Sequence, residues 1–226
     1  MKIKIVYKTE KIKMHSSISN LENIKKKLFN YPKAKIIAVS KTFKAEHITP
    51  LLDYGHKDFG ENKVQEALQK WPNLKEKYSN INLHMIGKLQ TNKVKFLFPH
   101  FDYIHSLDNM KLAEKISKEE YKNKKKLKIF IQVNLGDEEQ KNGISIKELP
   151  NLYEHSINEF GLNIIGLMCL PPKYGSASDY FKELKNLNIN LNLKELSMGM
   201  SQDYIEAASI GATYLRIGSS IFGSRI

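Results

Sequence analysis

The sequence predicts a single (β/α)8 barrel, and three features lead to that prediction. Short apolar segments alternate with longer amphipathic ones from residue 16 onward, which is typical of parallel strands joined by helices. The alternation repeats eight times in about 200 residues, whereas an open doubly wound sheet usually has fewer strands. No linker rich in proline, glycine or serine interrupts the series. We therefore expect one α/β domain over residues 16–226.

The expected strands are short, mostly rich in β-branched residues and bounded by turn-forming residues. They cover residues 36–40, 57–60, 82–87, 103–107, 128–134, 163–169, 195–199 and 213–218. A helix over 19–29 precedes them, and residues 90–93 open a further helix. Leu107-Asp108-Asn109 is expected to open a helix over 110–121, and Ser201 to open one over 202–210 that ends before Gly211.

The charge balance indicates an affinity for phosphate without choosing its source. The 226 residues include 36 lysines and arginines against 24 acidic residues, a formal charge of +12. Nucleic acid, a membrane surface and a small ligand would all attract such a chain. Arg216 and Arg225 are the only arginines, and a lysine-rich surface favours simple solvation over a nucleic-acid interface. Trp71 and the scattered tyrosines also lack the spacing of a base-stacking platform.

Cysteine usage and the apolar segments indicate a cytoplasmic protein that does not bind membranes. Cys169 is the single cysteine, which excludes an internal disulfide and a zinc site built from cysteine pairs. Residues 1–13 lack the apolar stretch of a signal peptide, and no segment approaches the ~18 apolar residues of a membrane-spanning helix. Residues 1–15 stay unassigned, because an added strand, a basic arm and a functional start at Met14 are all open.

In a barrel enzyme the active site lies at the C-terminal ends of the strands. The residues at these positions are Lys41, Glu61, Asn62, Gly87 to Gln90, Ser106, Asn134, Met168, Gly199 to Ser201, Arg216 and Gly218 to Ser220.

Lys41 directly follows the first expected strand, and two interpretations of it are open. A lysine that ends a strand commonly extends its ammonium group to water. Alternatively, a partly desolvated lysine loses its proton and attacks an aldehyde. The aldehyde would belong to a substrate, as in a lysine-dependent aldolase, or to pyridoxal 5′-phosphate.

The loops after the seventh and eighth strands are where barrels commonly bind phosphate. Ser201 begins one expected helix and Gly218-Ser219-Ser220 begins another, so two sets of free backbone amides would meet there. Ser201 is equally explained as a helix cap alone. Arg216 shares a strand face with Tyr214 and Gly218, which points its guanidinium inward. Such a group needs a partner, and either a structural salt bridge or a ligand would supply it.

These residues carry a resemblance to a known family. Residues 38–42, 59–66, 84–93, 104–108, 196–201 and 216–223 read AVSKT, FGENKVQE, HMIGKLQTNK, IHSLD, LSMGMS and RIGSSIFG. In this order and spacing they resemble the pyridoxal 5′-phosphate homeostasis protein family, over about residues 36 to 225. That family is a single-domain relative of the N-terminal barrel of alanine racemase, which is the barrel type the resemblance implies here.

The resemblance implies a site and a function. Lys41 would hold pyridoxal 5′-phosphate (PLP) as an internal aldimine, Asn62 would lie beside the ring, and Arg216 would face the pyridine nitrogen. Ser201 and the backbone of Gly218 and Ser219 would hold the phosphate. The family is understood to buffer PLP inside the cell and deliver it to apoenzymes, so an enzyme is not expected.

Other functions remain as alternatives. Lys41 would equally serve a weak PLP-dependent racemase or lyase, or an aldolase. The arginine at the ring nitrogen and the lack of the second alanine racemase domain both argue against racemisation. A nucleic-acid-binding module is a further alternative, motivated by the charge. A monomer is expected.

The family often has a second lysine two residues after the aldimine lysine, where this chain has Phe43, and Lys44 is expected to point elsewhere. His84 is interpreted as a packed strand histidine in preference to a proton shuttle.

Overall fold

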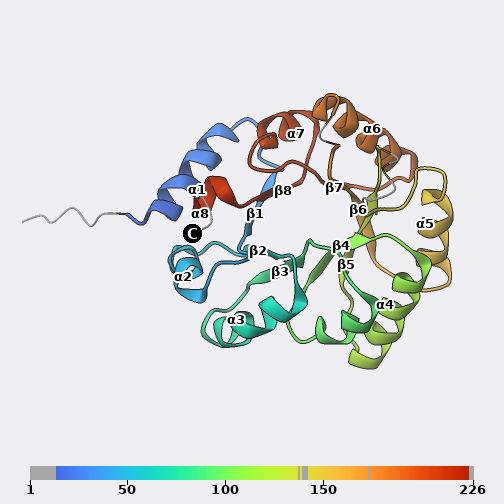
Figure 1. Cartoon of the computed structure of the whole chain (residues 1–226), viewed down its shortest axis with the longest axis horizontal. Coiled ribbons are helices and arrows are strands. Elements are labelled where there is room, and N and C mark those ends of the chain that lie inside the picture. Colours follow the sequence, from blue (N-terminus) through green and yellow to red (C-terminus); the bar gives the residue numbers. More distant parts are fainter. Residues whose placement is uncertain (1–13, 137, 139–141, 173, 224–226) are drawn as a thin grey trace, which may run out of the picture.

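Eight parallel strands, β1 to β8, close into a barrel in which β8 returns to pair with β1 (Figure 1). The structure is a computed structural model that describes residues 14–136, 138, 142–172 and 174–223. The barrel prediction is confirmed, whereas the expectations about residues 1–13 lie outside the described residues.

Every expected strand is present, and its ends move by at most two residues. The strands are β1 Lys35–Val39, β2 Asp58–Glu61, β3 Asn82–Met85, β4 Tyr103–Leu107, β5 Lys128–Val133, β6 Ile164–Cys169, β7 Glu195–Ser197 and β8 Tyr214–Ile217. β3 and β7 end two residues earlier than expected, at Met85 and Ser197.

Helices surround the barrel as an outer ring (Figure 1). They are α1 Ser16–Lys27, α2 Ala45–Asp53, α3 Val64–Lys77, α4 Met110–Asn123, α5 Leu149–Asn158, α6 Ala177–Asn190, α7 Tyr204–Ile210 and α8 Ser219–Phe222, with a 3-10 helix, η1 Thr91–Phe96, between β3 and β4. The helix start predicted at residues 107–109 is confirmed, and the Asn109 side chain caps α4 by accepting a hydrogen bond from the Leu112 amide at 2.9 Å. α1 lies beside α8, where the Asn20 amide donates to the Ile221 carbonyl at 3.0 Å. None of the described helices has the length and apolar character to span a bilayer.

The prediction that Ser201 caps the seventh helix is wrong. α7 begins at Tyr204, and residues 201–203 form a turn. The Asp203 amide donates to the Met200 carbonyl at 3.1 Å, and the Asp203 side chain accepts from the Met200 amide at 2.5 Å. These two bonds close the turn before the helix starts, so the Ser201 hydroxyl is available to other partners.

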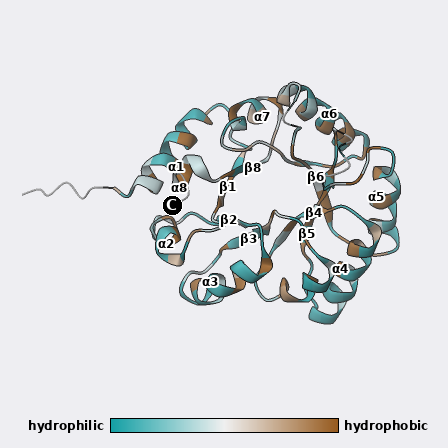
Figure 2. Ribbon diagram, viewed as in Figure 1, coloured by the Kyte–Doolittle hydropathy of each residue, from teal (hydrophilic) through white to brown (hydrophobic). Residues whose placement is uncertain are grey.

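The apolar side chains form two layers. One lies between the strands and the helices, where Figure 2 shows hydrophobic positions on the inner faces of the helices. The other fills the barrel interior with Ile37, Tyr103, Phe130, Met168 and Tyr214. Because side chains alternate along a strand, Tyr214 in the interior places Arg216 there too, which confirms the predicted direction of Arg216.

Candidate functional site

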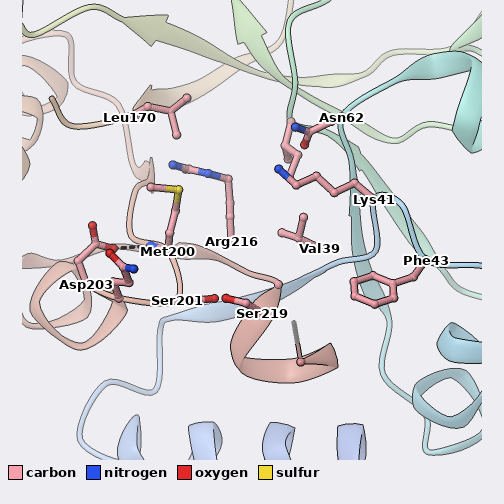
Figure 3. A pocket seen from close by; sticks show the side chains of 14 residues that line it. Val39, Lys41, Phe43, Asn62, Leu170, Met200, Ser201, Asp203, Arg216 and Ser219 are labelled. Carbon is pink, nitrogen blue, oxygen red and sulfur yellow. Dashed lines mark hydrogen bonds between the residues drawn. The ribbon is translucent and has the colours of Figure 1, made fainter. Parts of the chain in front are cut away.

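A cavity of about 500 Å³ opens at the C-terminal ends of the strands (Figure 3). Its lining includes all six residues predicted for a cofactor site, namely Lys41, Asn62, Ser201, Arg216, Gly218 and Ser219. Figure 3 shows the side chains of Lys41 and Arg216 entering the same space from different strands. Glu61, Ser106 and Met168 also stand at strand ends, but they are buried and do not line the cavity.

Hydrogen bonds hold the backbone of the loop immediately before and after Lys41. The Ser40 hydroxyl is buried and donates to Glu61 Oε1 at 2.6 Å. Thr42 has a φ of 68°, an uncommon conformation for a residue with a branched side chain, and its amide donates to Glu66. These contacts fix the backbone before and after Lys41, so the lysine side chain extends from a rigid base.

Lys70 and Glu61 form a buried ion pair beneath this loop. The Lys70 ammonium lies 2.9 Å from Glu61 Oε1 and donates to the carbonyls of Ser40 at 2.7 Å and Phe43 at 3.0 Å. Burial raises the pKa of Glu61, while Lys70 and the donors of Ser40 and Trp71 counteract that rise. The sequence analysis missed Lys70, because nothing in a chain with so many lysines distinguishes one on a helix.

Asn62 is positioned by a close contact between two loops. A Cβ atom on Gly87 would lie 2.3 Å from the Asn62 carbonyl oxygen, so only glycine allows the β3 loop to pass there. The contact holds the loop after β2 against the loop after β3. It thereby directs Asn62 toward the cavity.

The side chains of Ser201 and Ser219 lie close together at the lower end of the cavity in the view of Figure 3. The Ser201 hydroxyl accepts a hydrogen bond from the Ser220 amide at 3.3 Å, which ties the turn after β7 to the start of α8. Gly199, with a φ of 90°, permits that turn. The predicted meeting of the two loops is therefore present, although a single helix begins there and Ser201 bridges to it.

Arg216 is buried, with 4% of its surface exposed. Its guanidinium donates to Ser197 Oγ at 2.6 Å and to the Cys169 carbonyl at 2.8 Å. None of the ion pairs among the described residues includes Arg216, so the structural salt bridge left open above is absent from this part of the chain. Burial lowers the pKa of Arg216.

Phe43 marks the boundary between this cavity and a second one. Its ring packs on Phe222, with 4.9 Å between the ring centroids. Lys44 lines the second cavity and not the first, so the expectation that it points elsewhere is confirmed. No group of three or more potential metal ligands is found among the residues that the structure describes.

Comparison with known proteins assigns the family. Residues 12–226 match the family model described as alanine racemase, N-terminal domain. A pyridoxal phosphate homeostasis protein of Aquifex aeolicus is 40% identical over 201 residues, which are 85% of this chain and 87% of that protein. The Escherichia coli protein of the same name is 33% identical over 199 residues, covering 84% and 85%. The chain belongs to the pyridoxal phosphate homeostasis protein family.

Solved structures agree with the placement in the pyridoxal phosphate homeostasis protein family. PipY of Synechococcus elongatus, solved with PLP bound, has a TM-score of 0.80 and 32% identity, over 92% of this chain and 100% of that chain. Alanine racemase of Corynebacterium glutamicum has a TM-score of 0.70 at 12% identity, over 92% and 61%. The second likeness concerns the fold alone and supports a shared barrel type.

Proposed function

We propose that this protein binds PLP, bears it covalently on Lys41, and buffers it or delivers it to apoenzymes. The observation that carries the proposal is the convergence of Lys41 after β1, Ser201 after β7 and Arg216 on β8 on one cavity. The membership in the pyridoxal phosphate homeostasis protein family and the PLP bound to PipY support it.

The donor set of the cavity fits the functional groups of PLP. An aldehyde requires an amine, which Lys41 supplies, and a phosphate requires hydroxyl and amide donors, which the Ser201 and Ser219 region supplies. A volume of about 500 Å³ is in the ordinary range for small ligands. The buried Arg216 has a hydroxyl and a carbonyl as partners, so an acceptor on a ligand would add to its compensation.

Each residue has a separate role in the proposal. Lys41 anchors the cofactor, and Asn62 lies beside its ring. Ser201 and the backbone of Gly218 and Ser219 hold the phosphate. Arg216 faces the ring nitrogen and disfavours its protonation, whereas a protonated ring is the stronger electron sink that PLP supplies for carbanion chemistry. The arrangement therefore suits storage and transfer better than turnover.

The single cysteine, Cys169, is buried, and a chain without an internal disulfide fits a reducing compartment. We propose the cytoplasm, where apoenzymes that use PLP would be accessible. We also propose a monomer.

The test is covalent labelling of the lysine. PLP is added to the purified protein, borohydride reduces the adduct, and peptide mapping identifies the modified residue. We expect the label on Lys41, its loss in Lys41→Ala, and no change in Lys44→Ala, which alters an exposed lysine of the neighbouring cavity. A full label in Lys41→Ala would contradict the proposal. Steady-state turnover of amino acids that Lys41→Ala abolishes would indicate an enzyme instead of a carrier.

A further inference from the structure

A chain of hydrogen bonds crosses the barrel interior beneath the cavity. Arg216 donates to Ser197 Oγ at 2.6 Å, and Ser197 Oγ lies 2.8 Å from His105 Nδ1. His105 Nε2 lies 3.0 Å from His84 Nδ1, and His84 Nε2 lies 3.1 Å from Asp58 Oδ1. The chain thus links β8, β7, β4, β3 and β2.

The chain connects the two ends of the barrel. Ser197, His105 and His84 have no exposed surface. Asp58 begins β2, at the end opposite the cavity, and 20% of its side chain is exposed. A carboxylate in contact with solvent is therefore joined to the guanidinium at the cavity by groups that water does not reach.

The chemistry of the two ends determines the direction of every bond. An ionised carboxylate only accepts, so His84 Nε2 bears a proton and donates to Asp58. In a neutral imidazole the other nitrogen accepts, so His105 Nε2–H donates to His84 Nδ1. His105 Nδ1 then accepts from the Ser197 hydroxyl, which leaves Ser197 a lone pair for Arg216. Each of the four hydrogen bonds then has one donor and one acceptor.

The charge states that this assignment needs agree with the surroundings. Burial lowers the pKa of His84, and it lowers that of His105 well below the ordinary value, so both rings are neutral at neutral pH. Burial would raise the pKa of Asp58, but the hydrogen bonds from His84 and Asn82 lower it overall. Charged and titratable groups that face the two rings are Asp58, Asp102, Lys35, Arg216, Tyr103 and Tyr214.

We propose that Asp58, His84, His105 and Ser197 are positioning residues for Arg216. The Asp58 carboxylate selects the tautomer of both histidines, and this selection orients the Ser197 hydroxyl so that it accepts from the guanidinium. Arg216 is thereby held at a constant angle to the cavity. The consequence for bound PLP rests on the proposed function, whereas the tautomers are a property of the protein without ligand.

The first experiment needs no cofactor. Nitrogen-15 NMR of histidine-labelled protein reports which ring nitrogen carries the proton, and His84→Gln and His105→Gln assign the two signals. We expect both rings neutral and protonated at Nε2. In Asp58→Leu the acceptor is lost, and both rings should change to the Nδ1–H form, because the reversed chain then ends on the Ser197 oxygen. An Nδ1–H ring in the unaltered protein, or an unchanged His105 in Asp58→Leu, would overturn the proposal.

Two further variants distinguish the loss of the acceptor at position 58 from a folding defect. Asp58→Asn keeps an oxygen at the same place, because the Asn82 amide donates to Asp58 Oδ1 at 3.0 Å and would hold the carbonyl of the new side chain there. Asp58→Asn should therefore retain both Nε2–H rings. Asp58→Val removes the acceptor with a residue well suited to a strand, and it should repeat the change if Asp58→Leu does not fold. Different results in the two apolar variants would count against the proposal.

The second experiment measures the effect on Arg216. Ser197→Ala removes the acceptor, and Ser106→Ala is a matched control that removes a buried hydroxyl with no hydrogen-bond partner among the described residues. We expect about tenfold weaker PLP binding and a shifted visible absorbance maximum in Ser197→Ala, with neither change in Ser106→Ala. Equal effects of both variants would overturn the positioning role. If the unaltered protein bound no PLP, the proposed function would fail, and the NMR result would still decide on the chain.

Discussion

Ser201 lies in the turn after β7 and bridges to the start of α8 through the Ser220 amide. We expect Ser201→Asp to weaken PLP retention at least tenfold, because a carboxylate placed among phosphate donors repels the phosphate by several kcal/mol at short range. Equilibrium dialysis or absorbance titration measures the change. Ser209→Asp adds the same charge at an exposed position of α7 and should have little effect. Equal retention in both variants would remove Ser201 from the site.

Cys169 is a second residue whose behaviour follows from its surroundings. Its side chain is fully buried, and burial raises the pKa of its thiol to about 12. We expect a thiol reagent to modify it only as fast as the folded protein opens, and readily in guanidinium chloride, because the thiolate is the reactive form. A colorimetric thiol assay measures both rates. Rapid modification of the folded protein would show that the side of β6 that carries Cys169 is open to solvent.

At the scale of elements, the ion pair between α3 and β2 supports the loop of Lys41. We expect Lys70→Met to destabilise the protein by about 3 kcal/mol, because it leaves Glu61 charged and buried without its partner. Urea unfolding, monitored by Trp71, the single tryptophan, measures this loss.

Two matched variants serve as controls for the Lys70→Met measurement. The double variant Glu61→Gln/Lys70→Met should recover most of the lost stability, because no buried charge remains. Lys77→Met, at an exposed position of the same helix, should change stability little. A double variant as unstable as Lys70→Met would mean that packing, and not charge, accounts for the loss.

At the scale of the whole molecule, His84 and His105, together with His56 and His100, make stability depend on pH, because burial lowers the pKa of all four. The pKa of each is lowered in the folded protein, so the unfolded chain binds more protons as the pH falls below about 6.5. Stability should therefore fall on acidification, by at most about 1.4 kcal/mol per pH unit for each histidine. Urea unfolding at several values between about pH 7.5 and 5.5 measures the slope.

Variants distinguish these histidines from other titrating groups. His105→Gln should reduce the slope, since it removes one of the four histidines whose pKa is lowered in the folded protein. His47→Gln, at an exposed position, should leave the slope unchanged. A slope that His105→Gln does not alter would assign the acid sensitivity to other groups.

The order of residues along the chain is enough to predict the barrel and the residues at its mouth. Eight apolar segments at regular spacing specify eight strands, and parallel strands place their C-terminal ends on one side. Lys41, Asn62, Ser201 and Arg216 follow or end such strands, so the topology alone brings them to one cavity. The motifs of the family carry the same information, because they are the strand-end loops.

The partners of those residues were decided by the tertiary structure alone. Arg216 contacts Ser197 on β7 and the carbonyl of Cys169 on β6, and these contacts depend on the stagger between strands, which no local pattern encodes. The turn that frees Ser201 and the pairing of Lys70 with Glu61 likewise depend on how loops and helices pack. Residue type and periodicity specify which face a side chain occupies, whereas the register across the barrel determines which atom it meets.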